Sequence, residues 1–235
     1  MNLIQLDECE STHKYMRENF ANFSAWTVVV AESQTKGRGR HGRAWLAPKG
    51  KNLCFNILLR AKNLKPEHYA PTTQIAAITL AEILREKGIE ASIKWPNDIL
   101  VNKHKICGII SELLPEQSIS LGIGLNVNTE KSDFANLDRL ATSLYIETGK
   151  IFDKNAILQE FLHKFKANFE ILQKKGLEPF IEEWRKMGCF TGHNAKIIDE
   201  GSVLEGIIEA VNNDGSLLFR TEKGLKTVWS GDLEI

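Results

Sequence analysis

Apolar residues recur along the first 188 residues with two different periods. Apolar and β-branched runs predict strands at 3–6, 26–31, 52–59, 91–95, 99–102, 105–113 and 118–128, with a turn at Lys103-His104 joining 99–102 to 105–113. Apolar positions three and four residues apart predict helices that begin near residue 11, lie between 66 and 87, and span 153–175 and 179–187. The pattern therefore predicts an α+β domain with a mixed, largely antiparallel sheet.

The pattern changes after Gly188 to short alternating strands. They are expected at 195–198, 203–211, 217–220 and 226–229, with turns at 213–215 and 223–224. A unit of roughly 45 residues is too small to be stable without docking on a neighbour. We predict a main domain at residues 1–188 and a small all-β domain at residues 189–235.

Composition narrows the function classes. The chain has 30 basic and 30 acidic residues, so its net charge is zero, which argues against a protein that binds nucleic acid or membranes through bulk charge. The four cysteines are scattered without a zinc-binding spacing, no run approaches the ~20 apolar residues of a membrane span, and the N-terminus lacks a signal layout. We expect a cytoplasmic protein with no DNA or membrane partner.

One local feature departs from this balance. The stretch 34–45 reads QTKGRGRHGRAW, and no carboxylate occurs between Glu32 and Glu67. Closely spaced cations repel one another, and ordered glycines cost conformational entropy, so a chain that combines both at one place is suited to an anionic ligand. The alternative is a solvated basic surface loop.

The glycines of this stretch match several known motifs only in letters. Gly37, Gly39 and Gly42 fit G-x-G-x-x-G, but Pro48, Gly50 and then a strand follow, whereas a dinucleotide site needs a helix there. A P-loop needs Lys-Ser or Lys-Thr where this chain has Arg43-Ala44, and the V-A-I-K, H-R-D and D-F-G motifs of a kinase are absent. What remains is a loop between two strands whose guanidinium groups suit carboxylate or phosphate oxygens, with Trp45 as an apolar wall.

Two further clusters have both a functional and a structural interpretation. In Lys94-Trp95-Pro96-Asn97-Asp98, Asp98 is a candidate magnesium ligand, although Pro-Asn-Asp also favours an ordinary turn. Lys105 is placed to neutralise a carboxylate and a phosphate together, although most surface lysines only increase solubility. Ser11 and Thr12 precede a predicted helix and are also candidate caps.

These clusters together resemble the biotin–protein ligases over nearly the whole chain. The resemblance implies a catalytic domain like that of class II synthetases with a C-terminal SH3-like β-barrel. Because the motifs begin at Ser11, it also implies a monofunctional type without an N-terminal DNA-binding domain. The matching segments are Ser11-Thr12, Gly37–Trp45, Lys94–Asp98, Lys105–Gly108, Gly122–Asn128 and Ala141–Leu144.

The resemblance implies a reaction in two steps. Biotin attacks the α-phosphate of ATP to give biotinyl-5′-AMP and pyrophosphate, and a lysine of a biotin carboxyl carrier protein of acetyl-CoA carboxylase then takes the biotinyl group. ATP, Mg²⁺ and biotin would be the ligands, with no tightly bound prosthetic group, and a homodimer is possible.

The resemblance also assigns roles to particular residues. Lys105, Arg40 and Lys94 would be catalytic, Asp98 would bind Mg²⁺, and Arg43, Trp45, Asn97 and Asn126 would contact the nucleotide. Two alternatives stay open, namely a lipoate–protein ligase and a nucleic-acid-binding module that uses the basic loop. The residues expected to contact biotin or its adenylate are Ser11, Thr12, His13, Gln34, Arg38, Gly39, Arg40, Lys105 and Gly108.

Overall fold

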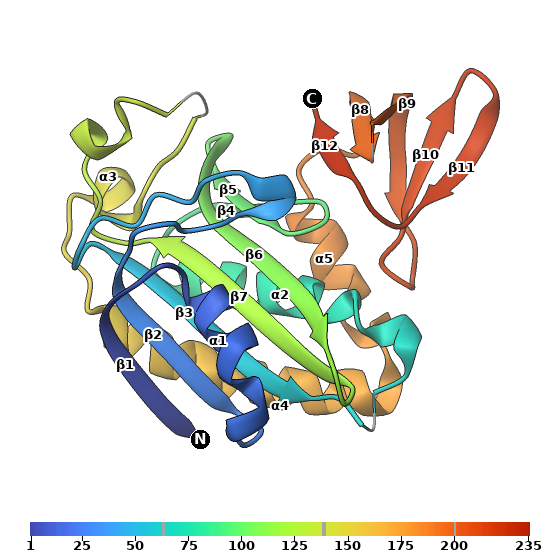
Figure 1. The fold of residues 1–235 in the computed structure, drawn as a ribbon. Coiled ribbons are helices and arrows are strands. Elements are labelled where there is room, and N and C mark those ends of the chain that lie inside the picture. Colours follow the sequence, from blue (N-terminus) through green and yellow to red (C-terminus); the bar gives the residue numbers. More distant parts are fainter. Residues whose placement is uncertain (63, 138–139, 200) are drawn as a thin grey trace.

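The main domain is built on a mixed, largely antiparallel seven-stranded sheet, as predicted (Figure 1). The computed structural model describes residues 1–62, 64–137, 140–199 and 201–235. The strand order is β1-β2-β3-β7-β6-β5-β4, in which β1 and β2 are parallel and the other neighbours antiparallel. The strands are β1 (Asn2–Cys9), β2 (Thr27–Gln34), β3 (Asn52–Arg60), β4 (Ala91–Lys94), β5 (Asp98–Val101), β6 (His104–Leu114) and β7 (Ser118–Asn126).

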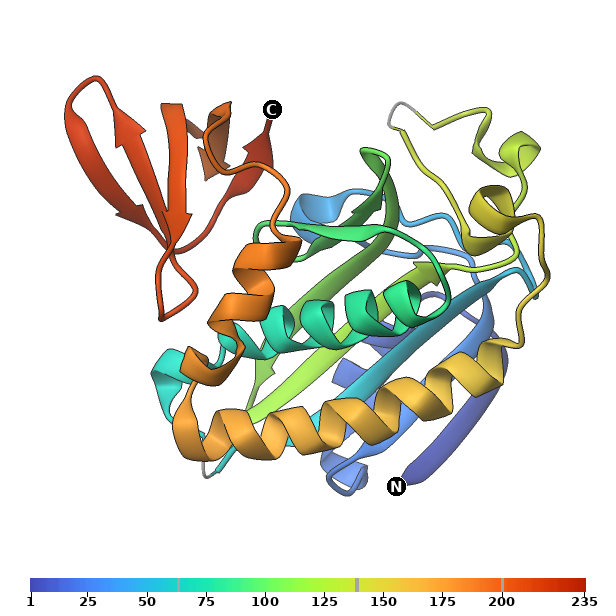
Figure 2. The ribbon, with the colours of Figure 1, turned by 180° about the vertical axis from the view of Figure 1, so that it is seen from behind.

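Two long helices cover one face of this sheet, and a short helix covers part of the other. Helices α2 (Pro71–Glu86) and α4 (Lys154–Lys175) lie side by side in Figure 2, and the rings of Phe161 and Phe165 on α4 stack 5.2 Å apart within the core. Helix α1 (Thr12–Asn19) lies on the opposite face, where its buried Met16 packs in a small second cluster. Most of the face that carries α1 therefore remains available for a site.

The chain ends in a small antiparallel sheet, which confirms the predicted all-β unit. Its order is β11-β10-β9-β8-β12, and α5 (Ile181–Met187) leads into it. The strand β12 was not predicted, because three residues are too few to show an alternating pattern. The strands are β8 (Asn194–Asp199), β9 (Ser202–Val211), β10 (Leu217–Thr221), β11 (Gly224–Val228) and β12 (Asp232–Glu234).

Local differences from the sequence analysis are small. The β5–β6 turn was predicted at Lys103-His104 but consists of Asn102 and Lys103, both with positive φ, while His104 already pairs with Val101 in the ladder. A two-residue hairpin of this kind favours asparagine at its first position, which explains the one-residue error. No helix among the described residues is long and apolar enough to cross a membrane. The remaining helical elements are α3 (Leu144–Thr148) and the 3₁₀ turns Phe20–Asn22, Arg40–Gly42, Pro66–His68, Lys131–Phe134 and Glu178–Phe180.

Candidate active site

A cavity on the α1 face of the sheet brings together ten of the predicted site residues. We call it the ligand cavity. These residues come from the start of α1, from the end of β2, from the loop after β2 at residues 35–45 (the basic loop) and from β6, so segments far apart in sequence converge in the cavity. Its lining residues are Ser11, Thr12, His13, Gln34, Arg38, Gly39, Trp45, Asn97, Lys105 and Gly108, with Ile109, Ile110, Gly122, Ile123 and Gly124.

Glycines on the two central strands make room for this cavity. Gly108 on β6 pairs directly with Gly124 on β7. A Cβ atom at Gly124 would lie 2.5 Å from the Trp45 ring, and one at Gly108 would lie 3.1 Å from the Lys105 ammonium. Glycine inside a strand marks close approach of another group, and here that group is the indole of the basic loop. Gly124 thus lets Trp45 approach the sheet, and Gly108 leaves room for the Lys105 side chain to lie over β6.

Neutral polar groups come from the start of α1 and the end of β2. The Thr12 backbone N–H and hydroxyl both donate to Gln34 Oε1, at 2.7 and 3.2 Å. Ser11 caps α1, because its hydroxyl oxygen accepts from the Lys14 N–H at 3.1 Å. Ser11 therefore has both roles that its sequence position allowed: it caps the helix and lines the cavity. Its hydroxyl hydrogen and the Gln34 amide nitrogen have no protein acceptor among the described residues.

His13 lies in a hydrogen-bonded cluster that no local sequence pattern predicts. Its Nδ1 accepts from the Asn56 amide at 3.1 Å, and its Nε2–H donates to Glu112 at 2.7 Å. The Ser120 hydroxyl donates to Asn56 Oδ1 at 3.0 Å. Burial lowers the pKa of His13, although the Glu112 carboxylate opposes that shift. Because both ring nitrogens are engaged, the neutral imidazole gives the cavity shape rather than a hydrogen bond.

Lys105 lies where three cavities meet. Its ammonium is 2.6 Å from Asp98 Oδ1 and 5.8 Å from the centre of the Trp45 ring. The same side chain lines the ligand cavity, a small pocket that contains Asn126, and a wide cleft next to the C-terminal unit. A cation at this junction is well placed to contact two anionic groups that enter from different sides.

The wide cleft, which we call the C-terminal cleft, collects the charged residues. Lys94 lies in it near Asp98 and Lys105, and burial lowers the pKa of Lys94 while Asp98 opposes the shift. No group of three or more His, Cys, Asp or Glu that could hold a metal occurs among the described residues, so Mg²⁺ at Asp98 would need phosphate oxygens as further ligands. The charged lining residues are Arg43, Lys94, Asp98, Lys103, Lys105, Asp232 and Glu234, with His193 beside them.

Two arginines of the basic loop reach the C-terminal unit. Arg43 Nη1 lies 2.8 Å from Asp232 on β12, and Arg40 Nη1 lies 3.8 Å from the same carboxylate. Arg40 also donates to the Gly231 carbonyl at 3.3 Å and to Asn97 Oδ1 at 3.4 Å. Asp232 was not predicted as a site residue. It gives the cations of the loop a counter-charge that local sequence does not supply.

The small pocket contains two of the four residues expected to contact the nucleotide, whereas Arg43 lines the C-terminal cleft and Asn97 the ligand cavity. Trp45 and Asn126 line it together with Phe134 and Leu137. Asn126 is also a structural residue, because its side chain accepts from Asn52 and donates to the Thr142 carbonyl, both at 3.0 Å. An aromatic and aliphatic pocket with one amide is suited to a flat heterocycle.

Comparisons with known proteins agree with this geometry. Residues 6–128 match the model of the biotin/lipoate A/B protein ligase family. The bifunctional ligase/repressor BirA of Bacillus spizizenii is 33% identical over 99% of this chain and 74% of that protein. The biotin–[acetyl-CoA-carboxylase] ligase of Mycobacterium tuberculosis is 27% identical over 88% of this chain and 77% of that protein.

A solved structure shows the same architecture. The biotin protein ligase from Aquifex aeolicus, in complex with biotin and ATP, superposes with a TM-score of 0.87 at 31% identity, covering 99% of this chain and 97% of that one. The likeness extends through the C-terminal unit, beyond the residues that the family model matches. The chain belongs to the biotin/lipoate A/B protein ligase family and is a ligase.

Proposed function

We propose that this ligase activates biotin as biotinyl-5′-AMP and transfers the biotinyl group to a lysine of a biotin carboxyl carrier protein of acetyl-CoA carboxylase. One observation carries the proposal: the ligand cavity combines a glycine floor, neutral hydrogen-bonding groups and one lysine at its junction with two further cavities. These parts match a ligand whose polar ring meets the neutral hydrogen-bonding groups, whose apolar chain lies on the glycines and whose carboxylate meets the lysine. We further propose that residues 1–188 form the catalytic domain and residues 189–235 close the site.

The polar groups of the cavity favour biotin over lipoate. The Ser11 hydroxyl and the Gln34 amide nitrogen are suited to the carbonyl oxygen of a ureido ring. A dithiolane ring offers no comparable partner, so these groups would lose their hydrogen bonds to water without compensation. The names of the similar proteins from Mycobacterium tuberculosis and Aquifex aeolicus point the same way.

In the first step the biotin carboxylate attacks the α-phosphorus of ATP and pyrophosphate leaves. Lys105 would bridge carboxylate and phosphate, while Arg38 in the ligand cavity, Lys94 in the C-terminal cleft and Arg40, which lines neither but donates to Asn97, would stabilise the charge on the phosphates. Mg²⁺, held by Asp98 and phosphate oxygens, would supply further charge neutralisation. The Asp98–Lys105 pair at 2.6 Å keeps the lysine aimed at this junction.

In the second step the lysine amine of the carrier attacks the acyl carbon, AMP leaves, and the amine loses a proton. The adenylate must survive until the carrier arrives, so water has to be excluded. Trp45 and the basic loop would cover the acyl phosphate while Trp45 and Asn126 flank the adenosine. We expect this reaction in the cytoplasm, without a DNA partner, by a monomer or a homodimer.

A pyrophosphate-release assay tests the proposal. The protein is incubated with ATP and Mg²⁺ and with biotin, lipoate or neither, and a purified carrier domain is then added and weighed by mass spectrometry. We expect release with biotin and a biotinyl mass increase on the carrier. Release with lipoate and not with biotin would support a lipoate ligase and contradict the proposal. Salt-sensitive RNA binding without any release would support a nucleic-acid-binding module.

A further inference from the structure

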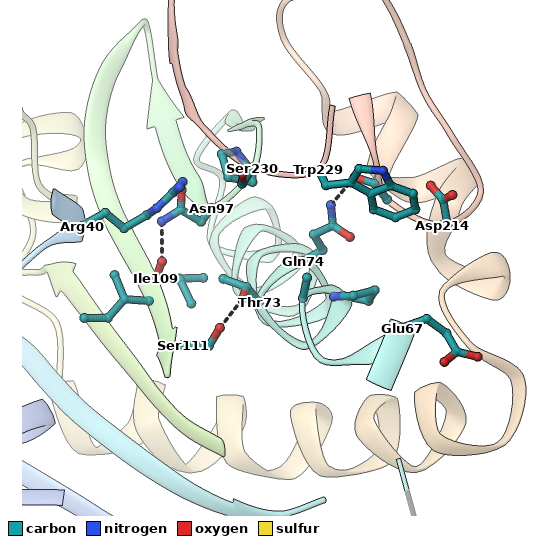
Figure 3. A pocket seen from close by; sticks show the side chains of 15 residues that line it. Arg40, Glu67, Thr73, Gln74, Asn97, Ile109, Ser111, Asp214, Trp229 and Ser230 are labelled. Carbon is teal, nitrogen blue, oxygen red and sulfur yellow. Dashed lines mark hydrogen bonds between the residues drawn. The ribbon is translucent and has the colours of Figure 1, made fainter. Parts of the chain in front are cut away.

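A groove separates the main domain from the C-terminal unit beside the ligand cavity, and we call it the junction groove (Figure 3). Arg40 and Asn97 lie at one end of it, with Gln74 and Asp214 toward the other. It shares Asn97 and two isoleucines of β6 with the ligand cavity, so the two spaces adjoin. A contact at this groove is therefore able to influence the site.

One backbone carbonyl in the groove accepts hydrogen bonds from two side chains of the main domain. The Gly215 carbonyl accepts from Gln74 Nε2 at 2.7 Å and from Trp95 Nε1 at 3.0 Å. Gln74 and Trp95 are both only 5% exposed. Gly215 has φ +86°, and a Cβ atom there would lie 2.0 Å from Gln74 Oε1. The contact therefore needs glycine for its conformation and for its close approach.

The turn that carries this carbonyl is held firmly. Asp214 accepts from the backbone N–H and the hydroxyl of Ser216, at 2.9 and 2.6 Å, and the Asn212 N–H donates to the Ser216 carbonyl at 2.9 Å. Arg185 on α5 adds hydrogen bonds to the Val211 carbonyl at 3.0 and 3.2 Å. A fixed turn presents its carbonyl in one direction, which makes it a suitable anchor for the two donors.

Trp95 connects this anchor to the candidate site. It begins the turn whose next residues include Asn97 and Asp98. Asn97 accepts from Arg40 and donates to the Ile109 carbonyl, while Asp98 pairs with Lys105. A shift of the indole would therefore move two groups that face the ligand cavity and the C-terminal cleft.

We propose that Gln74 is a positioning residue that holds the Gly215 carbonyl against Trp95 and so fixes the Trp95–Asp98 turn for the nucleotide phosphates. The inference rests on the proposed function, because Asp98 is assigned there to Mg²⁺ and the phosphates, and Asn97 precedes it in the same turn. Gln74 Oε1 is buried and has no partner among the described residues. An unmet buried acceptor offsets the gain from the bond that Nε2 makes, so this amide contributes to geometry more than to stability.

The test compares Gln74→Met with Arg185→Met. Gln74→Met removes one hydrogen bond to the turn at residues 211–216 and Arg185→Met removes three, but only Gln74 shares its acceptor with Trp95. In Gln74→Met we expect faster amide exchange at Trp95, Asn97 and Asp98 and an increase of about five-fold in the KM for ATP. The biotin KM should rise less, because Asn97 is one of many residues that line the ligand cavity. Arg185→Met leaves the hydrogen bonds that Asp214 and Asn212 make within the turn, so the amide exchange and the KM for ATP should both stay within about two-fold of the wild type. Unchanged exchange, or an equal rise in both KM values, would overturn the proposal.

A second variant keeps the test decisive if Gln74→Met does not fold. Trp95→Phe removes the other donor to the same carbonyl. It should also raise the KM for ATP more than the KM for biotin. Where both single variants fold, the KM for ATP of the double variant should not exceed that of the more impaired single variant, because both side chains act through one acceptor. Additive effects contradict the shared role. The exchange measurement needs no substrate, so it stands even if the wild-type protein fails to activate biotin.

Discussion

The ligand cavity and the C-terminal cleft lie next to each other but are built by different means. The cavity is made by absence of side chains on the central strands, at Gly108 and Gly124, and its polar residues are mostly neutral. The cleft contains fixed charges from three parts of the chain, among them Lys94, Asp98 and Asp232. Lys105 is common to both. Shape and hydrogen bonding dominate recognition in the first region, and charge dominates it in the second.

This difference assigns the two halves of an acyl-adenylation reaction to the two regions. The mostly neutral residues of the cavity are suited to hold a small ring, and Lys105 at the border with the cleft is placed to bind its carboxylate. The cations of the cleft can bind the phosphates, and its carboxylates neutralise those cations when no anion is bound. Substitutions can perturb both regions together, at the residue that they share, or each region separately.

Lys105→Ala should have the largest effect, because it removes the cation at the border of both regions. We expect biotin-dependent pyrophosphate release to fall by ~100-fold or more, in line with the loss of a charged group that contacts a reacting anion. Lys105 is not part of the apolar core, so the melting temperature should change little. Lys103→Ala is the control, since Lys103 lies in the same cleft but in the exposed β5–β6 turn. Normal turnover in Lys105→Ala would refute the shared role.

Gly124→Ala perturbs the ligand cavity without changing a charge in the C-terminal cleft. The new methyl would lie 2.5 Å from the Trp45 ring, so the indole has to move and the glycine floor is lost. We expect kcat/KM for biotin to fall roughly 10- to 100-fold, consistent with ~1–3 kcal/mol of overpacking. The KM for ATP should change less, because Trp45 lines the nucleotide pocket but not the charged cleft that would hold the phosphates. Gly188→Ala is the matched control, because its methyl would meet nothing nearer than 3.3 Å and lies outside the cavity. Equal losses for both substrates would show that the two regions are not separable.

The sequence predicted the ligand cavity better than its supporting residues. Ser11, Gln34, Arg38 and Lys105 belong to short motifs with distinctive composition, and the fold brings them together as expected. Asn56, by contrast, is one polar residue in a buried strand, and its partner His13 is 43 positions away. No local sequence pattern predicts the pair of Asn56 and His13, because the two residues meet only after α1 packs on the sheet.

The same reason explains the residues missed in the cleft and the groove. Asp232 follows the last predicted strand, in an element of three residues that shows no period. Gln74 looks like a polar interruption in an apolar helix, and only the docking of the C-terminal turn 141 positions later gives it a partner. Element types were predictable from periodicity, whereas contacts between the two units depend on how they dock.

Asp232→Asn tests the charged region at its C-terminal side. Without the carboxylate, Arg40 and Arg43 lose the counter-charge that positions them, and the KM for ATP should rise about three-fold, as expected for a partly exposed ion pair. The biotin KM should stay constant. Glu234→Gln is the control, because Glu234 is exposed on the same strand. A lower KM for ATP would mean that Asp232 competes with the nucleotide instead of positioning the arginines.

The smallest effect concerns pH and the neutral character of the ligand cavity. Burial lowers the pKa of His13 below its ordinary 6.5, while the neighbouring Glu112 carboxylate opposes the shift and Arg17 adds to it. Below about pH 6.5 the unfolded chain binds a proton at this residue that the folded protein does not yet bind, so stability is full above that pH and falls as the pH decreases toward the lower folded-state pKa. Thermal melts of the wild type, His13→Asn and the exposed-site control His163→Asn should be compared between about pH 7.5 and 5.5. The decline should be smaller in His13→Asn than in the wild type and unchanged in His163→Asn. The same decline in all three proteins would contradict a neutral His13 in the folded state.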